Sequence, residues 1–238
     1  MGEGAGLRGA LRRLLWRARG AGGVQDAHLA LLDSLEWQEP LRGMTYTALD
    51  CEMTGLDPKR DEILSVGAVR IRDGRAVLKE RFYQVFKPDA AVSPKEIVLI
   101  HGLGDEEVGR ASSLGEALEP LLEFLGETVL VGHFVRIDLD FLNAGLQRHG
   151  RPALQNAALD TRLLYRWLMR HRGQPDLEQP GVERLEAIVE SLGLPRFPAH
   201  QAYYDALSAG LVFLKLQEEF ERAGRVQFQS LFREAGVY

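Results

Sequence analysis

The sequence predicts an α/β domain built on a mixed sheet, with an antiparallel three-strand meander and two parallel strands flanked by helices. The first observation is a set of three β-rich runs, separated only by short polar turns, within residues 44–86. The second is an alternation of helical and strand patterns after residue 113. The third is a composition of 45% hydrophobic and 26% charged residues in 238, which is ordinary for a globular protein.

The meander is predicted from residue types. Its three runs are TYTALDCEM, EILSVGAVRIR and AVLKERFYQVF. Asp73-Gly74, between the second and third runs, is a strong hairpin signal because both residues accept a positive φ. The later pattern predicts a strand at TVLVG, a short strand ending at Leu159-Asp160, and helices near 114–125, 138–148, 161–170, 182–192 and 202–222.

The chain divides at about residue 43 by composition. Residues 1–43 are predicted to be a helical extension, basic at its start, and residues 44–238 the main domain. The arginines of the extension favour a solvated basic helix over a targeting segment, so a cytoplasmic location is preferred to a mitochondrial one. The single cysteine, Cys51, excludes an internal disulfide, and no apolar run is long enough for a membrane span.

The net charge of −5 excludes a strong non-specific DNA binder, which would need a basic face. A nuclease that holds nucleic acid through bound cations stays open, because the metal ions then supply the positive charge.

The first acidic motif lies at the end of the first predicted strand. Asp50 and Glu52 are two residues apart, so both carboxylates project to one side of the strand and Cys51 to the other. Neighbouring carboxylates repel unless a cation or a proton lies between them. The pair therefore indicates a metal site, and a solvated edge strand is the alternative.

Two further motifs supply acidic residues at element ends. Asp138 follows the strand TVLVG, where α/β sheets place ligands. Asp140 lies two residues on, so only one of these two can point into a common cluster. In PRFPAHQAYYDALSAG, His200 is predicted on the loop that enters a helix and Asp205 inside that helix. Taken singly, each motif also fits a capping or solvated residue.

Taken together, these motifs resemble the DnaQ-like exonucleases of the DEDDh class, a family that includes the epsilon proofreading subunit of bacterial DNA polymerase III. The matching stretches span roughly residues 44–220 and are DCEMTGL, IHGL, VGHFVRIDLDFL, LDT and HQAYYDA. Met53 stands where the family usually has Thr, and Phe134 where it usually has Asn. The resemblance implies an RNase H-like fold and a 3′→5′ exonuclease acting on nucleic acid with a free 3′ end, with a DNA polymerase as a partner.

The resemblance also implies roles for individual residues. It assigns two divalent ions, Mg²⁺ or Mn²⁺, to Asp50, Glu52, Asp138 and Asp205, since hard cations prefer oxygen ligands. It assigns the general base to His200. It assigns contacts with the terminal nucleotide to Thr54, Leu56 and His101. Asp160 is expected to order the loop after its strand and not to bind metal.

Two other functions stay open at this point. One is an RNA-trimming or short-oligonucleotide nuclease, because the metal ions act on the phosphodiester and not on the sugar or base. The other is a nucleic-acid- or polymerase-binding module that has lost activity. Loss of any of the four carboxylates or of His200 would favour the second, and all five are present.

Overall fold

The computed structural model describes residues 40–87, 111–174 and 181–237. The elements in chain order are η2 (Leu41–Gly43), β1 (Tyr46–Met53), β2 (Ile63–Arg72), β3 (Arg75–Val85), α5 (Leu114–Leu125), β4 (Val129–Gly132), α6 (Val135–Arg148), β5 (Ala158–Asp160), α7 (Thr161–His171), α8 (Leu185–Ser191), α9 (Ala202–Arg222), α10 (Phe228–Ala235) and β6 (Gly236–Val237). The predicted extension at residues 1–43 falls almost entirely outside these ranges.

Within the described ranges the strands form one six-stranded sheet in the order β3-β2-β1-β4-β5-β6. The pairs β1–β2 and β2–β3 are antiparallel and form the predicted meander. The Asp73-Gly74 turn joins β2 to β3. The pairs β1–β4 and β4–β5 are parallel, as the alternating pattern predicts. The predicted mixed sheet flanked by helices is therefore confirmed, and β1 lies at its centre.

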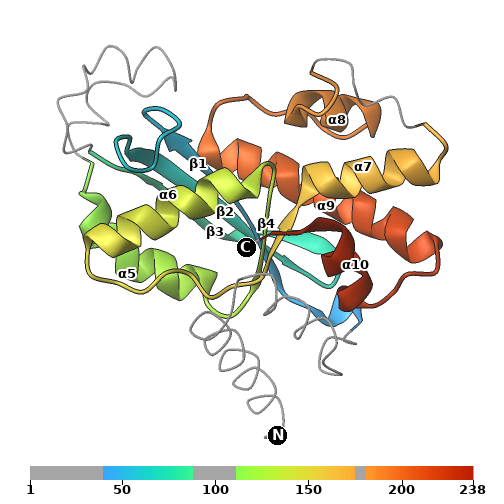
Figure 1. The fold of residues 1–238 in the computed structure, drawn as a ribbon, viewed down its shortest axis with the longest axis horizontal. Helices are drawn as coiled ribbons and strands as arrows, with labels where there is room; N and C mark the ends of the chain where they lie inside the picture. The colour runs from blue at the N-terminus through green and yellow to red at the C-terminus, as the bar shows by residue number, and fades with distance from the viewer. Residues whose placement is uncertain (1–39, 88–110, 175–180, 238) are drawn as a thin grey trace, which may run out of the picture.

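Helices cover the two faces of the sheet (Figure 1), and each face packs into its own hydrophobic cluster. Tyr46 and Ala48 of β1 belong to the cluster formed with α7, α8, α9 and α10. Leu49 and Cys51 belong to the cluster formed with α5 and α6. In β1 the even-numbered residues therefore face the side of the sheet that α9 covers, because side chains alternate between the two faces along a strand. None of the described helices combines the length and apolar character that a membrane span needs.

The C-terminal elements were not expected from the sequence. The helix α10 is short and β6 has two residues, so neither carries a periodic pattern long enough to predict. They form through tertiary contacts: β6 pairs with β5, and α10 buries Phe228, Leu231 and Phe232. The helix α6 also begins at Val135, three residues before the predicted start.

Close packing between β2 and the start of α9 depends on Gly67. A Cβ at this position would lie 2.2 Å from the backbone carbon of Ala202 and 2.2 Å from the backbone nitrogen of Tyr203. Gly67 is also the β2 partner of Asp50. The missing side chain therefore allows the first turn of α9 to approach the acidic end of β1.

We expect Gly67→Ala to lower the free energy of unfolding by about 1–3 kcal/mol, the usual cost of overpacking, because backbone atoms must move. Gly43→Ala is the matched control, since its Cβ would meet only Pro40, at 4.0 Å. Urea denaturation of both variants measures the difference. Equal stability of the two variants would show that α9 does not need this close approach.

Candidate active site

Asp50 and Glu52 lie on the half of β1 that extends beyond its pairing with β4. The parallel pairing ends at Ala48, opposite Val131, while pairing with β2 continues to Met53. Both carboxylates lie on the α9 side of the sheet, and Cys51 packs on the opposite side. The predicted orientation of the pair is therefore confirmed.

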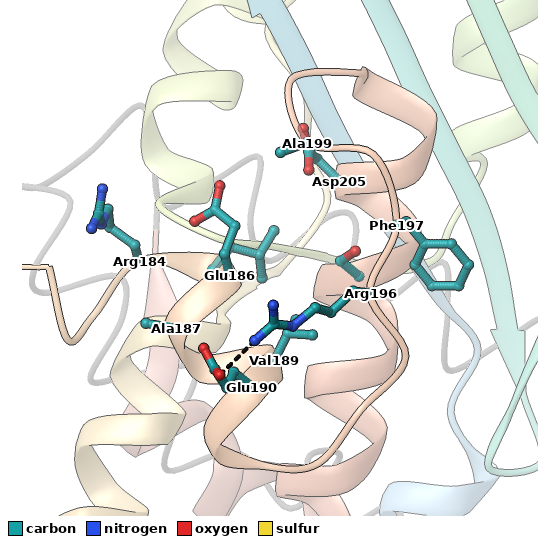
Figure 2. A pocket seen from close by; sticks show the side chains of 11 residues that line it. Arg184, Glu186, Ala187, Val189, Glu190, Arg196, Phe197, Ala199 and Asp205 are labelled. Atoms are coloured by element: carbon teal, nitrogen blue, oxygen red, sulfur yellow. Dashed lines mark ion pairs between the residues drawn. The ribbon is translucent and has the colours of Figure 1, made fainter.

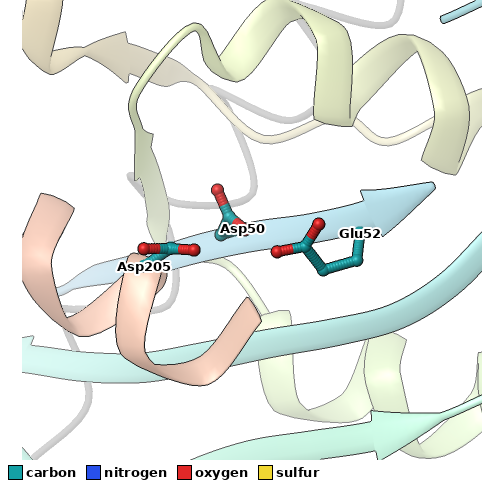
Figure 3. Close-up of side chains that lie close together, drawn as sticks. All are labelled: Asp50, Glu52 and Asp205. Carbon is teal, nitrogen blue, oxygen red and sulfur yellow. The ribbon is translucent and has the colours of Figure 1, made fainter. Parts of the chain in front are cut away.

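Asp205 reaches the same place from α9. It lies in the first turn of this helix, where it accepts a hydrogen bond from the backbone N–H of Gln201 at 3.1 Å. Carboxylate oxygens of Asp50, Glu52 and Asp205 all lie within 4.8 Å of one another (Figure 3). Asp205 lies 155 positions after Asp50 and 153 after Glu52 in the sequence, yet the three residues form one acidic cluster, to which we refer as the Asp50 cluster.

The electrostatics of the cluster favour a bound cation. Burial raises the pKa of Asp50 well above its usual range, and the charges of Asp138, Asp205 and Glu52 raise it further. Burial, followed by Glu52, raises the pKa of Asp205 to about 6, although the hydrogen bond from Gln201 acts in the opposite direction. All four influences on Asp50 oppose ionisation, so these carboxylates need protons or metal ions between them.

Asp138 occupies the first turn of α6 and is only 4% exposed. Its Oδ1 accepts a hydrogen bond from the backbone N–H of Cys51 at 2.8 Å, which fixes it against the end of β1. It is not one of the three residues whose oxygens lie within 4.8 Å, but its charge acts on Asp50. Asp140 pairs instead with Arg136 at 2.9 Å on the outer side of the helix. Only one of the two aspartates thus points inward, as the sequence predicts.

His200 lies on the loop immediately before α9. Its backbone adopts a positive φ of 60°, and the residue is exposed. The Asp205 carboxylate interacts with the His200 backbone and with its imidazole, and both interactions lower the pKa of Asp205. The structure therefore places His200 beside the Asp50 cluster, on the loop predicted for it, and outside the group of oxygens within 4.8 Å.

Comparison with known proteins agrees with this geometry. A sequence model of the RNase_T family, described as "Exonuclease", matches residues 47–213, which is more than half of the chain. The chain belongs to this exonuclease family. The matched range contains Asp50, Glu52, Asp138, His200 and Asp205.

Curated relatives of the chain include bacterial proteins named DNA polymerase III PolC-type and DNA polymerase III subunit epsilon. The PolC-type DNA polymerase III of Thermotoga petrophila is 30% identical over 194 residues, which cover 82% of this chain and 13% of that protein. The DNA polymerase III subunit epsilon of Aquifex aeolicus is 28% identical over 188 residues, covering 78% of this chain and 87% of that protein. The chain thus spans only about an eighth of the PolC-type relatives.

Solved structures share the fold of this exonuclease domain. The E. coli exonuclease I bound to single-stranded DNA superposes with a TM-score of 0.64 at 19% identity, covering 75% of this chain and 41% of that one. Cell-death related nuclease 4 gives a TM-score of 0.60 at 18% identity, covering 78% and 66%. These likenesses establish the RNase H-like fold.

Exonucleases of this kind are metal-dependent, and the Asp50 cluster suits a metal ion by its donors. It offers one carboxylate oxygen from each of three residues, without sulfur or nitrogen ligands, which is the set that hard divalent cations prefer. The raised pKa of Asp50 points the same way, because burial and like charges combine there. The residues present therefore fit a bound divalent cation.

The three residues assigned to the terminal nucleotide are in different situations. Thr54 closes the turn after β1: its Oγ1 accepts a hydrogen bond from the Glu62 backbone N–H at 3.0 Å. Leu56 is 80% exposed within this turn. His101 lies outside the described residues. Asp160 caps α7 by accepting a hydrogen bond from the Arg162 backbone N–H at 2.8 Å, so it orders the start of this helix and not the loop expected after its strand.

A cavity of about 380 Å³ lies beside Asp205, between α8 and the loop that precedes α9 (Figure 2). Its lining includes Arg184, Glu186 and Phe197, and an ion pair joins Arg196 to Glu190 at 2.5 Å. Sequence reasoning missed this cavity because its walls come from three separate segments, and no local pattern marks them. Asp205 therefore borders both the Asp50 cluster and an adjoining cavity.

The burial of Asp138 leads to a prediction for the metal-free protein. Burial raises the pKa of this carboxyl to about 8 in the folded state, against about 4 in an unfolded chain. The folded state then holds the Asp138 proton more tightly than the unfolded state does. The contribution of this group to the free energy of unfolding is therefore complete below pH 4 and is lost as the pH rises through 8. We expect Asp138→Asn to remove this loss, because Asn can still accept the Cys51 hydrogen bond.

The measurement is the melting temperature of both proteins between pH 5 and 9 in excess chelator. The variant should gain stability over wild type as pH rises. Asp140→Asn is the control, because Asp140 lies on the exposed side of the same helix. A constant difference between wild type and Asp138→Asn across this range would contradict a buried, protonated Asp138.

Proposed function

We propose that the chain is a metal-dependent 3′→5′ exonuclease that hydrolyses phosphodiester bonds at 3′ ends, with single-stranded DNA as its preferred substrate. The observation that carries this proposal is the convergence of Asp50, Glu52 and Asp205 within 4.8 Å on an exonuclease-family scaffold. Loss of any of these carboxylates would have favoured a binding module without activity.

The proposed cofactor is a pair of Mg²⁺ or Mn²⁺ ions. Asp50, Glu52 and Asp205 would supply direct ligands, and the charge of Asp138 also acts on Asp50. Because its Oδ1 is held by the Cys51 N–H, Asp138 would act through water or through its other oxygen. Two such ions, when bound, neutralise the scissile phosphate and stabilise the attacking and leaving oxygens.

The residues of the chain would supply the remaining chemistry. A water oxygen forms a bond to phosphorus, and the bond from phosphorus to the 3′ oxygen of the preceding nucleotide breaks. His200 would accept the proton of that water as general base, since an imidazole titrates near neutral pH. The products are a nucleoside 5′-monophosphate and a strand with a new 3′ hydroxyl.

DNA is proposed as the substrate because two kinds of relative are DNA polymerase III components. The same relatives support a DNA polymerase as a partner of this chain. The net charge of −5 favours a protein that holds the 3′ end of the nucleic acid through bound metal ions and not through a broad basic surface. RNA is the alternative substrate, and the test below distinguishes it from DNA.

The test uses 5′-labelled single-stranded DNA, duplex DNA and RNA, each with Mn²⁺ or with chelator. We expect a ladder of products shortened from the 3′ end in Mn²⁺ and none in chelator, because the clustered carboxylates repel without cations. A strand with a blocked 3′ end and a circular strand should stay intact. Cleavage of the circular strand, or full activity after exhaustive chelation, would overturn the proposal. Faster degradation of RNA than of DNA would make RNA the preferred substrate.

A further inference from the structure

The backbone of Phe134, at the position where the resemblance leads us to expect Asn, is strained. Phe134 precedes α6 as the N-cap residue, with φ 56° and ψ 33°, and its side chain makes no capping hydrogen bond. This left-handed conformation suits Gly, Asn or Asp and is unfavourable for a bulky residue. Asn would also cap the helix. The backbone conformation at this position therefore does not favour a phenylalanine.

Strain of this kind is confined to few places in the described ranges. Positive φ values at residues other than glycine occur there at Asp73, Phe134 and His200. Asp73 belongs to the hairpin turn between β2 and β3, where the conformation is ordinary. His200 is beside the Asp50 cluster, and Phe134 begins the helix that carries Asp138. Backbone strain that persists beside an active site is a reason to look for function.

The Phe134 ring packs against one charged and one aromatic side chain. The Arg162 guanidinium carbon lies 4.7 Å from the ring centroid, and the His133 ring meets it edge-on at 4.9 Å and 83°. Arg162 pairs with Glu183 at 3.6 Å. His133 is held at both nitrogens, by the Thr161 hydroxyl at 2.9 Å and by the Glu183 carbonyl at 2.8 Å.

These contacts hold the Phe134 ring in place and leave it partly exposed to solvent. Phe134 is 39% exposed, and Ile137, in the next turn of α6, is 38% exposed. The ring therefore presents an apolar surface to solvent at the carboxyl end of β4, next to β1. A cation behind the ring adds to its attraction for a second π system in front.

We propose that Phe134, with Arg162 behind it, forms a stacking platform for an unpaired base of the substrate strand. This inference rests on the proposed function and names a contact that would select its substrate. An unpaired base has a free face, whereas a base within a duplex is already stacked on its neighbours. The platform would thus favour single-stranded ends with little preference among the four bases.

The test is binding of single-stranded oligonucleotides that carry 2-aminopurine near the 3′ end and phosphorothioate linkages that resist hydrolysis. Stacking on Phe134 should quench 2-aminopurine fluorescence in the wild type. We expect Phe134→Ala and Phe134→Asn to lose the quenching and to bind about 5- to 150-fold more weakly, the range for one base–aromatic stack. Phe134→Tyr keeps a ring and should keep both signals.

Stability provides the second measurement. Phe134→Asn relieves the left-handed backbone but loses the ring contacts with Arg162 and His133, so its melting temperature should stay within about 2–4 °C of wild type. Weaker binding by a variant of near wild-type stability cannot be attributed to misfolding. Leu78→Ala is the control for an exposed apolar residue: Leu78 is 53% exposed on β3, near the opposite end of the sheet from Glu52.

The outcomes separate this inference from the proposed function. If wild type degrades single strands and Phe134→Ala binds and quenches like wild type, the platform is wrong and the exonuclease stands. If wild type binds with Phe134-dependent quenching but hydrolyses nothing, the platform stands and the exonuclease is wrong. An equal loss of affinity for single-stranded and blunt duplex ends in Phe134→Ala would also overturn the platform.

Discussion

We expect Asp205→Asn to abolish nuclease turnover and metal binding together. Asp205 supplies one of the three oxygens of the Asp50 cluster, and Asn replaces a charged oxygen with a neutral one. Asn keeps the acceptor for the Gln201 N–H, so the first turn of α9 should stay folded. The rate should fall by at least about 10³-fold, because a bound metal supplies several kcal/mol of charge stabilisation in the transition state.

Two measurements check this result: single-turnover hydrolysis of labelled DNA, and the rise of melting temperature with added Mn²⁺. A metal that binds only the folded state raises the melting temperature, so the variant should lose most of that rise. Glu190→Gln is the matched control, because Glu190 lines the cavity beside Asp205 and pairs with Arg196. An Asp205→Asn protein that keeps its Mn²⁺ response would remove Asp205 from the metal ligands.

Strand alternation explains why part of the site could be predicted. A period of two places Asp50 and Glu52 on one face whatever the rest of the fold, and the structure agrees. Helix geometry similarly separates Asp138 from Asp140. These predictions need only the local type of each element, which long periodic segments specify well.

Other features depend on tertiary contacts that no local pattern encodes. The approach of Asp205 to Asp50 requires β2 to carry Gly67 under the start of α9. The contact of Phe134 with Arg162 requires the starts of α6 and α7 to lie side by side, which follows from the parallel pairing of β4 with β5. The short elements α10 and β6 form only because β5 and the core are already in place.

We expect His200→Asn to fail in a different way from Asp205→Asn. Asn tolerates the positive φ of 60° at this position but has no basic nitrogen to accept a proton. Turnover should therefore fall by about 10²–10⁴-fold in kcat, the usual contribution of a general base, while the Mn²⁺-dependent rise in melting temperature is retained. His200 lies outside the group of oxygens that converge within 4.8 Å, so its loss removes no ligand from that group.

The pH–rate profile at saturating Mn²⁺ provides the deciding measurement. The wild-type rate should rise with pH through the range where an imidazole loses its proton, because only the neutral ring can act as base. That rise should disappear in His200→Asn and persist in Glu190→Gln. If His200→Asn keeps a near-normal kcat, or if it loses Mn²⁺ as completely as Asp205→Asn, His200 is not the base. A water held only by the carboxylates and their ions would then have to lose its proton to solvent.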